Sequence, residues 1–214
     1  MTKVTHLPGF EDSVHDAQRT FRSLLDANAR PGTPYPITAS MTVPPGLTLG
    51  CAAACLTLLD LDVQVWLQPS FASSATPHSP LPTPHSFFQV RDWLVFHTGC
   101  RFTQQPGEAD FALIGDLAAL PELSDFNWGT AEQPEASTTL LIQVESWEKG
   151  QPVMLTGPGI LDRTEIAPQV PRHFWDFWVK NHQAYPQGLD VFLFTENAVM
   201  GLPRTAKSEV YYES

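Results

Sequence analysis

Cysteines are the first residues in this chain whose type and spacing could carry chemistry. Cys51 and Cys55 lie four residues apart within an expected helix, so both thiols would share one face. The iron–sulfur cluster of a radical SAM enzyme would need a third cysteine at position 58, where the chain has Leu58. The ligand count argues against such a cluster, and we expect no metal site. Two small core residues are the expected alternative, since free cysteine is often buried.

A second pairing joins Cys100 to His97, three residues before it. A thiol beside a base is typical of a nucleophilic hydrolase, although no carboxylate that would orient this histidine is evident. His97 and Thr98 also place a histidine next to a hydroxyl, which could act as a general base or bind a phosphate group. The alternative is a histidine tied to a backbone carbonyl at the end of a strand.

A glycine-rich turn is the third candidate. Thr156, Gly157 and Gly159 follow an expected strand, and the glycines would let the backbone approach a ligand to which the threonine hydroxyl donates. Pro158 supplies no N–H, and the spacing is neither that of a Walker A loop nor that of a Rossmann loop. A structural turn that leaves a strand is therefore the alternative.

The fourth candidate is Arg204, followed by Thr205 near the end of the chain. A guanidinium at the edge of a strand could hold a phosphonate or phosphate through two parallel hydrogen bonds. It could equally pair with an acid across a subunit interface, which the excess of acidic residues favours. Glu135 and Asp190 are acids that could serve a site or cap a turn.

The elements that must position these residues begin with an amphipathic helix from Ser13 to the break at Pro31-Gly32, with Ser13 as the expected N-cap. Its expected core face comprises Val14, Ala17, Phe21, Leu24 and Leu25. Further helices are expected over Leu49–Leu59, Phe87–Trp93, Leu117–Leu123 and Pro171–Ala184. Expected single strands are Val63–Leu67 and Asp110–Ile114.

Two antiparallel hairpins complete the expected elements. In the first, Thr139–Ser146 and Pro152–Thr156 flank a turn at Glu148-Lys149-Gly150. In the second, Leu189–Thr195 and Ala198–Leu202 flank Glu196-Asn197. Helices interspersed with strands and hairpins predict an α/β domain with a mixed β-sheet sandwiched by helices.

Length and charge limit the class of protein. We expect one domain over residues 1–214, with a flexible tail at 1–12 and a proline-rich loop at 69–86. The formal net charge of −11 argues against a nucleic-acid surface and against an anionic membrane surface. No apolar run is long enough to cross a membrane, and an odd number of cysteines does not suggest disulfides. We therefore expect a cytoplasmic protein.

Several short segments, taken in their order from about Ser13 to Thr205, resemble the PhnH family of bacterial carbon–phosphorus lyase subunits. They are Phe96-His97-Thr98, Pro134-Glu135 with Thr138–Gln143, Leu155–Ile160, Pro186–Asp190 and Leu202–Thr205. The resemblance implies the fold of the large domain of PLP-dependent transferases. The chain has only Lys3, Lys149, Lys180 and Lys207, none of which suits a buried Schiff base, so we expect no cofactor.

The resemblance also implies a function. Proteins of this family pair as homodimers in isolation and join PhnG, PhnI and PhnJ in a complex that degrades alkylphosphonates. The resemblance attaches one step to the PhnG, PhnH and PhnI subunits with PhnL, in which a phosphonate replaces the adenine of ATP to give ribose 1-phosphonate 5-triphosphate. The resemblance therefore implies a subunit with little or no activity alone, with phosphonate or ATP bound at shared interfaces.

Two other functions remain open: a purely structural subunit without a ligand site, and an independent hydrolase built on Cys100 and His97. For a homodimer, we expect the interface to include the tryptophans of the C-terminal helix and an edge strand at Ala198–Leu202.

Overall fold

The computed structural model describes residues 7–72 and 85–210. Its α-helices are α1 (Ser13–Ala29), α2 (Leu49–Leu58), α3 (His85–Thr98) and α4 (Arg172–Gln183). The first five strands are β1 (Tyr35–Pro36), β2 (Gln64–Leu67), β3 (Arg101–Thr103), β4 (Phe111–Ile114) and β5 (Thr139–Gln143). The others are β6 (Val153–Thr156), β7 (Thr164–Ile166), β8 (Asp190–Phe194), β9 (Ala198–Leu202) and β10 (Lys207–Val210).

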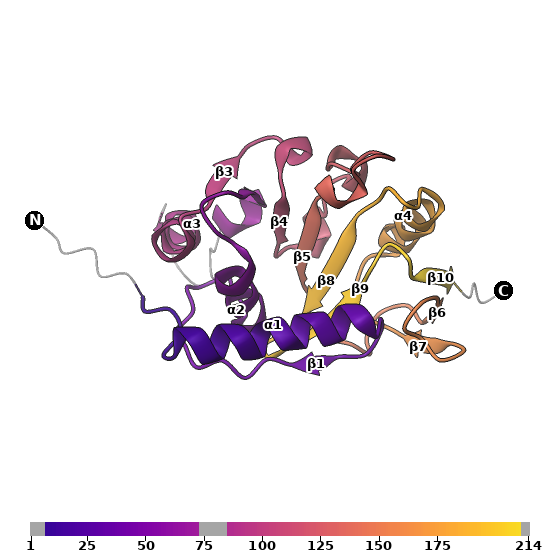
Figure 1. The fold of residues 1–214 in the computed structure, drawn as a ribbon, viewed down its shortest axis with the longest axis horizontal. Helices are drawn as coiled ribbons and strands as arrows, with labels where there is room; N and C mark the ends of the chain where they lie inside the picture. Colours follow the sequence, from indigo (N-terminus) through magenta and orange to yellow (C-terminus); the bar gives the residue numbers. More distant parts are fainter. Residues whose placement is uncertain (1–6, 73–84, 211–214) are drawn as a thin grey trace, which may run out of the picture.

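The strands form a mixed seven-stranded sheet and a smaller three-stranded sheet (Figure 1). The large sheet has the order β1-β9-β8-β5-β4-β2-β3, in which β3, β2, β4, β5 and β8 are parallel while β9 and β1 are antiparallel to their neighbours. The small sheet has the order β10-β6-β7 and is antiparallel. The expected α/β class with a mixed sheet is confirmed.

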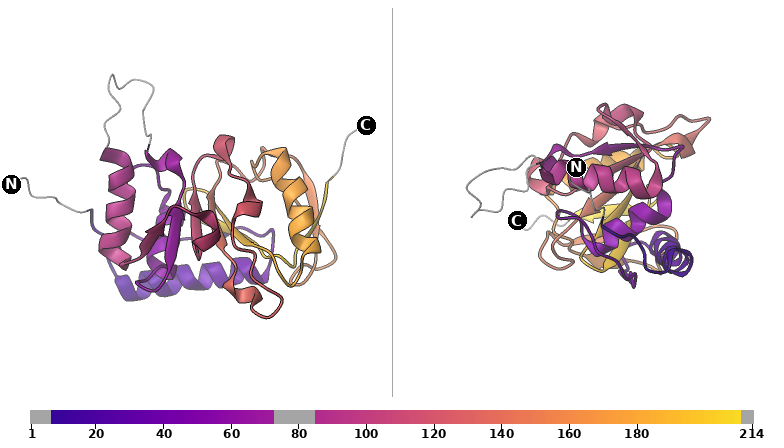
Figure 2. Two further views of the ribbon diagram at one scale, coloured as in Figure 1. Left: turned by 90° about the horizontal axis from the view of Figure 1, so that it is seen from above. Right: turned by 90° about the vertical axis from the view of Figure 1, so that its left-hand side faces the viewer.

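Alternate residues of the large sheet build two separate cores. Leu113 and Leu141 face one layer, which contains α1, α2 and α3, whereas Ile114 and Leu140 face the other, which contains α4 and the small sheet. This alternation follows from the two-residue period of side chains along a strand. The sheet is thus covered on both faces, and α3 and α4 lie at its opposite ends (Figure 2).

Helix α1 begins one residue earlier and buries a different face than expected. Asp12 is its N-cap and accepts from the backbone N–H of His15 at 3.1 Å. The buried residues are Asp16, Thr20, Leu24 and Ala27. The expected core positions Val14, Phe21 and Leu25 are instead exposed, because the helix is rotated to pack its small and polar residues on α2 and β9.

The expected hairpin between Thr139–Ser146 and Pro152–Thr156 is wrong, whereas the second hairpin, between β8 and β9, is confirmed. Strand β5 pairs in parallel with β4 and β8, and β6 belongs to the small sheet. The buried run Leu140-Leu141-Ile142 is typical of a central parallel strand, which is apolar on both faces. The expected helix at Leu117–Leu123 is two short 3-10 turns, Leu117–Ala119 and Leu123–Asp125.

The surface expected for a homodimer is not available in this fold. Trp175 and Trp178 of α4 are fully buried, and Phe174 packs with them in the same core. Strand β9 lies between β1 and β8 rather than at an edge. Burial of these side chains therefore excludes them as a contact patch, while the homodimer itself stays a prediction.

The expected tail and loop fall partly outside the described residues. Within the tail, the carbonyl oxygen of Leu7 accepts hydrogen bonds from the side chains of Trp93 and His97, so this residue is held against α3. In the proline-rich loop, Pro69–Ala72 form a 3-10 turn, and residues 73–84 lie outside the described chain. Among the described residues, no helix is long and apolar enough to span a bilayer.

Candidate functional site

A cavity of about 580 Å³ lies at the amino-terminal edge of the parallel strands. It is placed there because Thr139 begins β5, Asp190 begins β8, and Arg204 follows the antiparallel β9. The lining comes from five parts of the chain: Asn28 and Ala29; Pro134, Glu135, Ser137 and Thr139; Pro158 and Gly159; Tyr185, Pro186 and Asp190; and Pro203, Arg204 and Thr205. Parallel pairing of β5 with β8 thus unites segments that are far apart in sequence.

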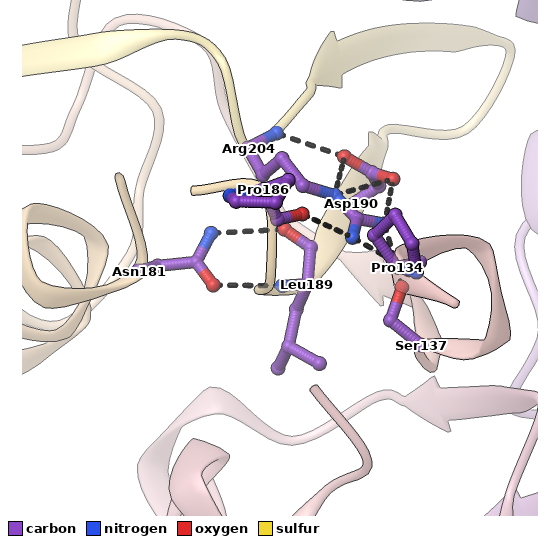
Figure 3. A network of polar contacts seen from close by, with 7 residues as sticks. All are labelled: Pro134, Ser137, Asn181, Pro186, Leu189, Asp190 and Arg204. Carbon is purple, nitrogen blue, oxygen red and sulfur yellow. Dashed lines mark hydrogen bonds and ion pairs between the residues drawn. The ribbon is translucent and has the colours of Figure 1, made fainter. Parts of the chain in front are cut away.

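Arg204 is the centre of a polar network at this cavity (Figure 3). Its Nη2 donates to Asp190 at 2.5 Å and to the hydroxyl of Ser137 at 2.6 Å. Its Nη1 donates to the carbonyl oxygens of Pro134 at 2.8 Å and Pro186 at 3.2 Å. Its Nε donates to both carboxylate oxygens of Asp190, and its backbone N–H donates to the same side chain at 2.8 Å.

These contacts use all five N–H groups of the Arg204 guanidinium. The side chain is 11% exposed and its partner Asp190 is 31% exposed, so the pair is sheltered on one side and reaches the cavity on the other. The acid that balances this arginine therefore belongs to the same chain rather than to a second subunit. A phosphonate could bind Arg204 only by replacing contacts that the chain already makes.

Two further contacts fix the segment that carries Asp190. The side-chain amide of Asn181, fully buried in α4, donates to the carbonyl oxygen of Leu189 at 2.9 Å and accepts from its N–H at 2.7 Å (Figure 3). A Cβ at Gly188, where φ is +127°, would lie 2.8 Å from the Asn181 Oδ1. Glycine is thus required for the close approach that sets the start of β8.

The glycines of the turn after β6 serve chain packing. A Cβ at Gly159 would lie 2.0 Å from the carbonyl oxygen of Ala29 at the end of α1, and φ there is +83°. A Cβ at Gly157 would lie 2.8 Å from the carbonyl oxygen of Thr205. The close backbone approach expected here is therefore made to other parts of the chain, and it brings α1 beside the turn.

The structure divides the sequence-derived candidates between two places. Gly159, Arg204 and Thr205 line the cavity, and Gly157 contacts Thr205. Thr156 pairs with Lys207 in the small sheet, one residue from that turn. The structure therefore brings these five candidates together.

His97 and Thr98 lie at the other end of the sheet, on α3 (Figure 2). His97 Nε2 is 2.9 Å from the carbonyl oxygen of Leu7, and the ring packs edge-on against Trp93 at 5.0 Å. The Thr98 hydroxyl donates to the carbonyl oxygen of Leu94 and accepts from the N–H of Cys100. Thr98 thus closes the end of α3, whereas His97 holds the segment at Leu7 against this helix.

The cysteines are core residues. Cys51, Cys55 and Cys100 are all buried and free. The hydrogen bond that the Cys55 thiol donates to Cys51, together with burial, raises the pKa of Cys55 well above its ordinary value. Burial also raises the pKa of Cys100, which opposes formation of the thiolate that a nucleophile needs. In the described part of the chain, no cluster of histidine, cysteine and acids could hold a metal ion.

A second cavity, of about 430 Å³, lies at the carboxyl edge of β4 and β5. Its polar lining includes Asp116, Gln143, Glu145 and Gln169. Gln143 accepts from the N–H of Thr48 and donates to the carbonyl oxygen of Gly46, so its amide joins β5 to the start of α2. None of the candidates chosen from the sequence lines this second cavity.

Sequence reasoning missed Tyr185 and Ser137 at the first cavity and gave Asp190 no partner. One signal could have revealed the Asp190–Arg204 pair. Both residues lie in segments of the resemblance, near the ends of two expected strands, and their side chains carry opposite charges. Tyr185 stands directly before the segment that begins at Pro186, and the bond between them is a cis peptide. No pattern in the sequence indicated that the side chain of Tyr185 is exposed.

Comparison with known proteins shows the family to which the chain belongs. The family described as bacterial phosphonate metabolism protein (PhnH) matches residues 8–209. A relative from Rhizobium meliloti (strain 1021), alpha-D-ribose 1-methylphosphonate 5-triphosphate synthase subunit PhnH, is 39% identical over 201 residues, covering 94% of each chain. The match includes every segment that lines the first cavity, and the chain belongs to the PhnH family of bacterial phosphonate-metabolism proteins.

Proposed function

We propose that this chain is a subunit of a cytoplasmic enzyme complex that replaces the adenine of ATP with an alkylphosphonate. The product would be a ribose 1-phosphonate 5-triphosphate. The observation that carries the proposal is the similarity over 94% of the chain to a named subunit of ribose 1-methylphosphonate 5-triphosphate synthase. A reaction that consumes ATP suits the cytoplasm.

The chemistry would take place where this chain meets its partners, for which we propose PhnG, PhnI and PhnJ. The bonding of Arg204 supports this location, because its guanidinium already has partners for all its donors and is better suited to shaping a surface than to holding a phosphonate. ATP and phosphonate would then bind at shared interfaces. We also propose that the chain forms a homodimer in the absence of these partners.

The fold proposal is that the large sheet retains the architecture of the large domain of PLP-dependent transferases without its cofactor. The mixed sheet with helices on both faces supports it. The three lysines within the described residues, Lys149, Lys180 and Lys207, are all exposed, whereas a Schiff base requires an enclosed pocket. A common fold would not by itself carry a common activity.

The test is release of adenine from ATP in the presence of methylphosphonate, with purified PhnG, PhnI and PhnL and with or without this chain. We expect release only when the chain is present, and none from the chain alone. Release by the chain alone would support an independent enzyme. Equal release with and without the chain would rule out the proposed role in this reaction.

A further inference from the structure

The cavity beside Arg204 carries an excess of negative charge. Asp190 balances the guanidinium, whereas Glu135, which also lines the cavity, forms no ion pair with any residue that the structure describes. The chain as a whole has a formal net charge of −11. A cationic group is therefore favoured both by the lining and by the field around the protein.

Proline gives the lining a surplus of hydrogen-bond acceptors over donors. Four lining residues are Pro134, Pro158, Pro186 and Pro203. Proline has no N–H, and backbone N–H groups are the usual ligands of an oxyanion. The proline carbonyl oxygens are acceptors, although those of Pro134 and Pro186 already accept from Arg204 and that of Pro203 accepts from the N–H of Ala206. A lining poor in backbone N–H groups does not suit a phosphonate, and the carboxylate of Glu135 suits a group that only donates hydrogen bonds, such as a guanidinium.

An exposed apolar stripe on α1 runs up to this cavity. Val14, Phe21 and Leu25 are 72%, 47% and 54% exposed and recur at intervals of seven and four residues, so they share one face of the helix. Asn28 and Ala29, which line the cavity, follow Leu25 by three and four residues on the same face. Apolar side chains beside a charged recess are typical of a protein interface.

We infer that the cavity and this stripe form one docking surface for a partner subunit, which inserts an arginine side chain beside Glu135. The docking surface comprises Val14, Phe21, Leu25, Glu135 and Tyr185, with the rest of the cavity lining. Only the identity of the partner rests on the proposed function. Arginine is favoured over lysine because a planar guanidinium can pack on the ring of Tyr185, which is 61% exposed, while it donates to several acceptors at once.

Binding of a guanidinium in the cavity can be tested on the isolated chain with a small probe. Acetyl-arginine amide should shift the NMR signals of residues that line the cavity, whereas acetyl-citrulline amide, of similar shape but uncharged, should not. The substitution Glu135→Gln should weaken the arginine probe about tenfold, as expected for the loss of one charge-assisted contact. Methylphosphonate that shifts the same signals more strongly than the arginine probe would overturn the inference.

The whole surface can be tested in the complex of full-length chains. Substituting a photo-crosslinking phenylalanine analogue for Tyr185 should yield a crosslink to a segment of PhnG, PhnI or PhnJ that contains arginine. A crosslink to a second copy of this chain, to a segment without arginine, or to nothing would overturn the inference. Leu25→Glu should reduce recovery of the complex, whereas Leu61→Glu, at an exposed leucine outside this surface, should not.

Charge reversal provides the matched control. Glu135→Arg should abolish recovery of the complex, while Glu132→Arg, three residues away and outside the lining, should leave it unchanged. If Glu135→Arg still assembles and the complex still releases adenine, the docking inference fails and the proposed function stands. If the natural chain does not assemble at all, the proposed function fails, and the arginine probe still decides the chemistry of the recess.

Discussion

The guanidinium of Arg204 meets the carboxylate of Asp190 at 2.5 Å, in a contact that joins the segment after β9 to the first residue of β8. The same carboxylate accepts the backbone N–H of Arg204. Through Pro134 and Ser137, the contact also reaches the segment before β5. One ion pair therefore holds the ends of three neighbouring segments in place.

Removing both partners of this pair should cost less stability than the sum of removing each one alone. Asp190→Asn or Arg204→Met alone should each lower the free energy of unfolding by about 3 kcal/mol, because a sheltered charge loses its partner. The double variant should lose about 2 kcal/mol less than the sum of the two. Urea unfolding of the four proteins measures this coupling.

The matched control for this cycle is the exposed pair Arg30–Asp26, whose side chains are 58% and 42% exposed. The same set of single and double variants at this pair should show no measurable coupling in the free energy of unfolding, because solvent screens such pairs. Equal coupling in the two cycles would show that Arg204 is not a special structural centre.

Alanine substitutions at two glycines should distinguish the cost of steric overlap from the cost of backbone strain. Gly46 and Gly159 both have positive φ, +98° and +83°, but a Cβ at Gly46 would meet nothing closer than 3.5 Å, whereas one at Gly159 would lie 2.0 Å from the Ala29 carbonyl oxygen. Gly46→Ala should cost about 1–2 kcal/mol from strain alone. Gly159→Ala should cost clearly more, and thermal unfolding of both variants gives the comparison. Similar costs would contradict the packing of this turn on α1.

The thiols should be inert in the folded protein. Burial raises the pKa of Cys100, and the hydrogen bond that Cys55 donates to Cys51, together with burial, raises that of Cys55, so both stay protonated near neutral pH. A thiol-reactive chromophore at pH 8 should therefore label none of the three cysteines rapidly before unfolding, and all three in denaturant. Fast labelling of Cys100 in the native protein would revive the hydrolase hypothesis.

The N-cap of α1 should give a pH-dependent contribution to stability. The backbone N–H and the side chain of His15 donate to Asp12 and lower the pKa of its carboxyl group below its ordinary value of 3.8. The contribution is therefore present above the unfolded pKa and is lost as the pH falls through the lower folded pKa. Asp12→Asn should keep a cap but remove this dependence, so the difference in melting temperature between the two proteins should shrink from pH 6 to pH 3. A constant difference would contradict the prediction.

Local patterns in the sequence predicted the elements better than their partners. The turn at Glu196-Asn197 correctly predicted the β8–β9 hairpin, because that pairing is made by adjacent residues. The turn at Glu148-Lys149-Gly150 suggested a second hairpin, but Leu140-Leu141-Ile142 pair with strands far away in the chain. Parallel pairing leaves no local turn to mark it, so sequence periodicity could not reveal it.

The same limit applies to the candidate site and to α1. The resemblance identified the segments around the cavity, but only the sheet order brings Thr139, Asp190 and Arg204 together. On α1, apolar residues stand on two faces, and hydrophobicity alone favoured Val14 and Phe21 for the core. The structure instead buries Asp16, whose carboxylate accepts from the N–H of Asp12 and pairs with Arg19.

The assembly of one cavity from five distant segments has a consequence during synthesis. A chain that has emerged only as far as Ala184 contains α1 and β5 but lacks Tyr185, Asp190 and Arg204. The recess exists only after the last strand of the large sheet has been added. A protein that recognises this recess therefore distinguishes finished molecules from fragments, and by binding only the finished ones it shifts the folding equilibrium towards them.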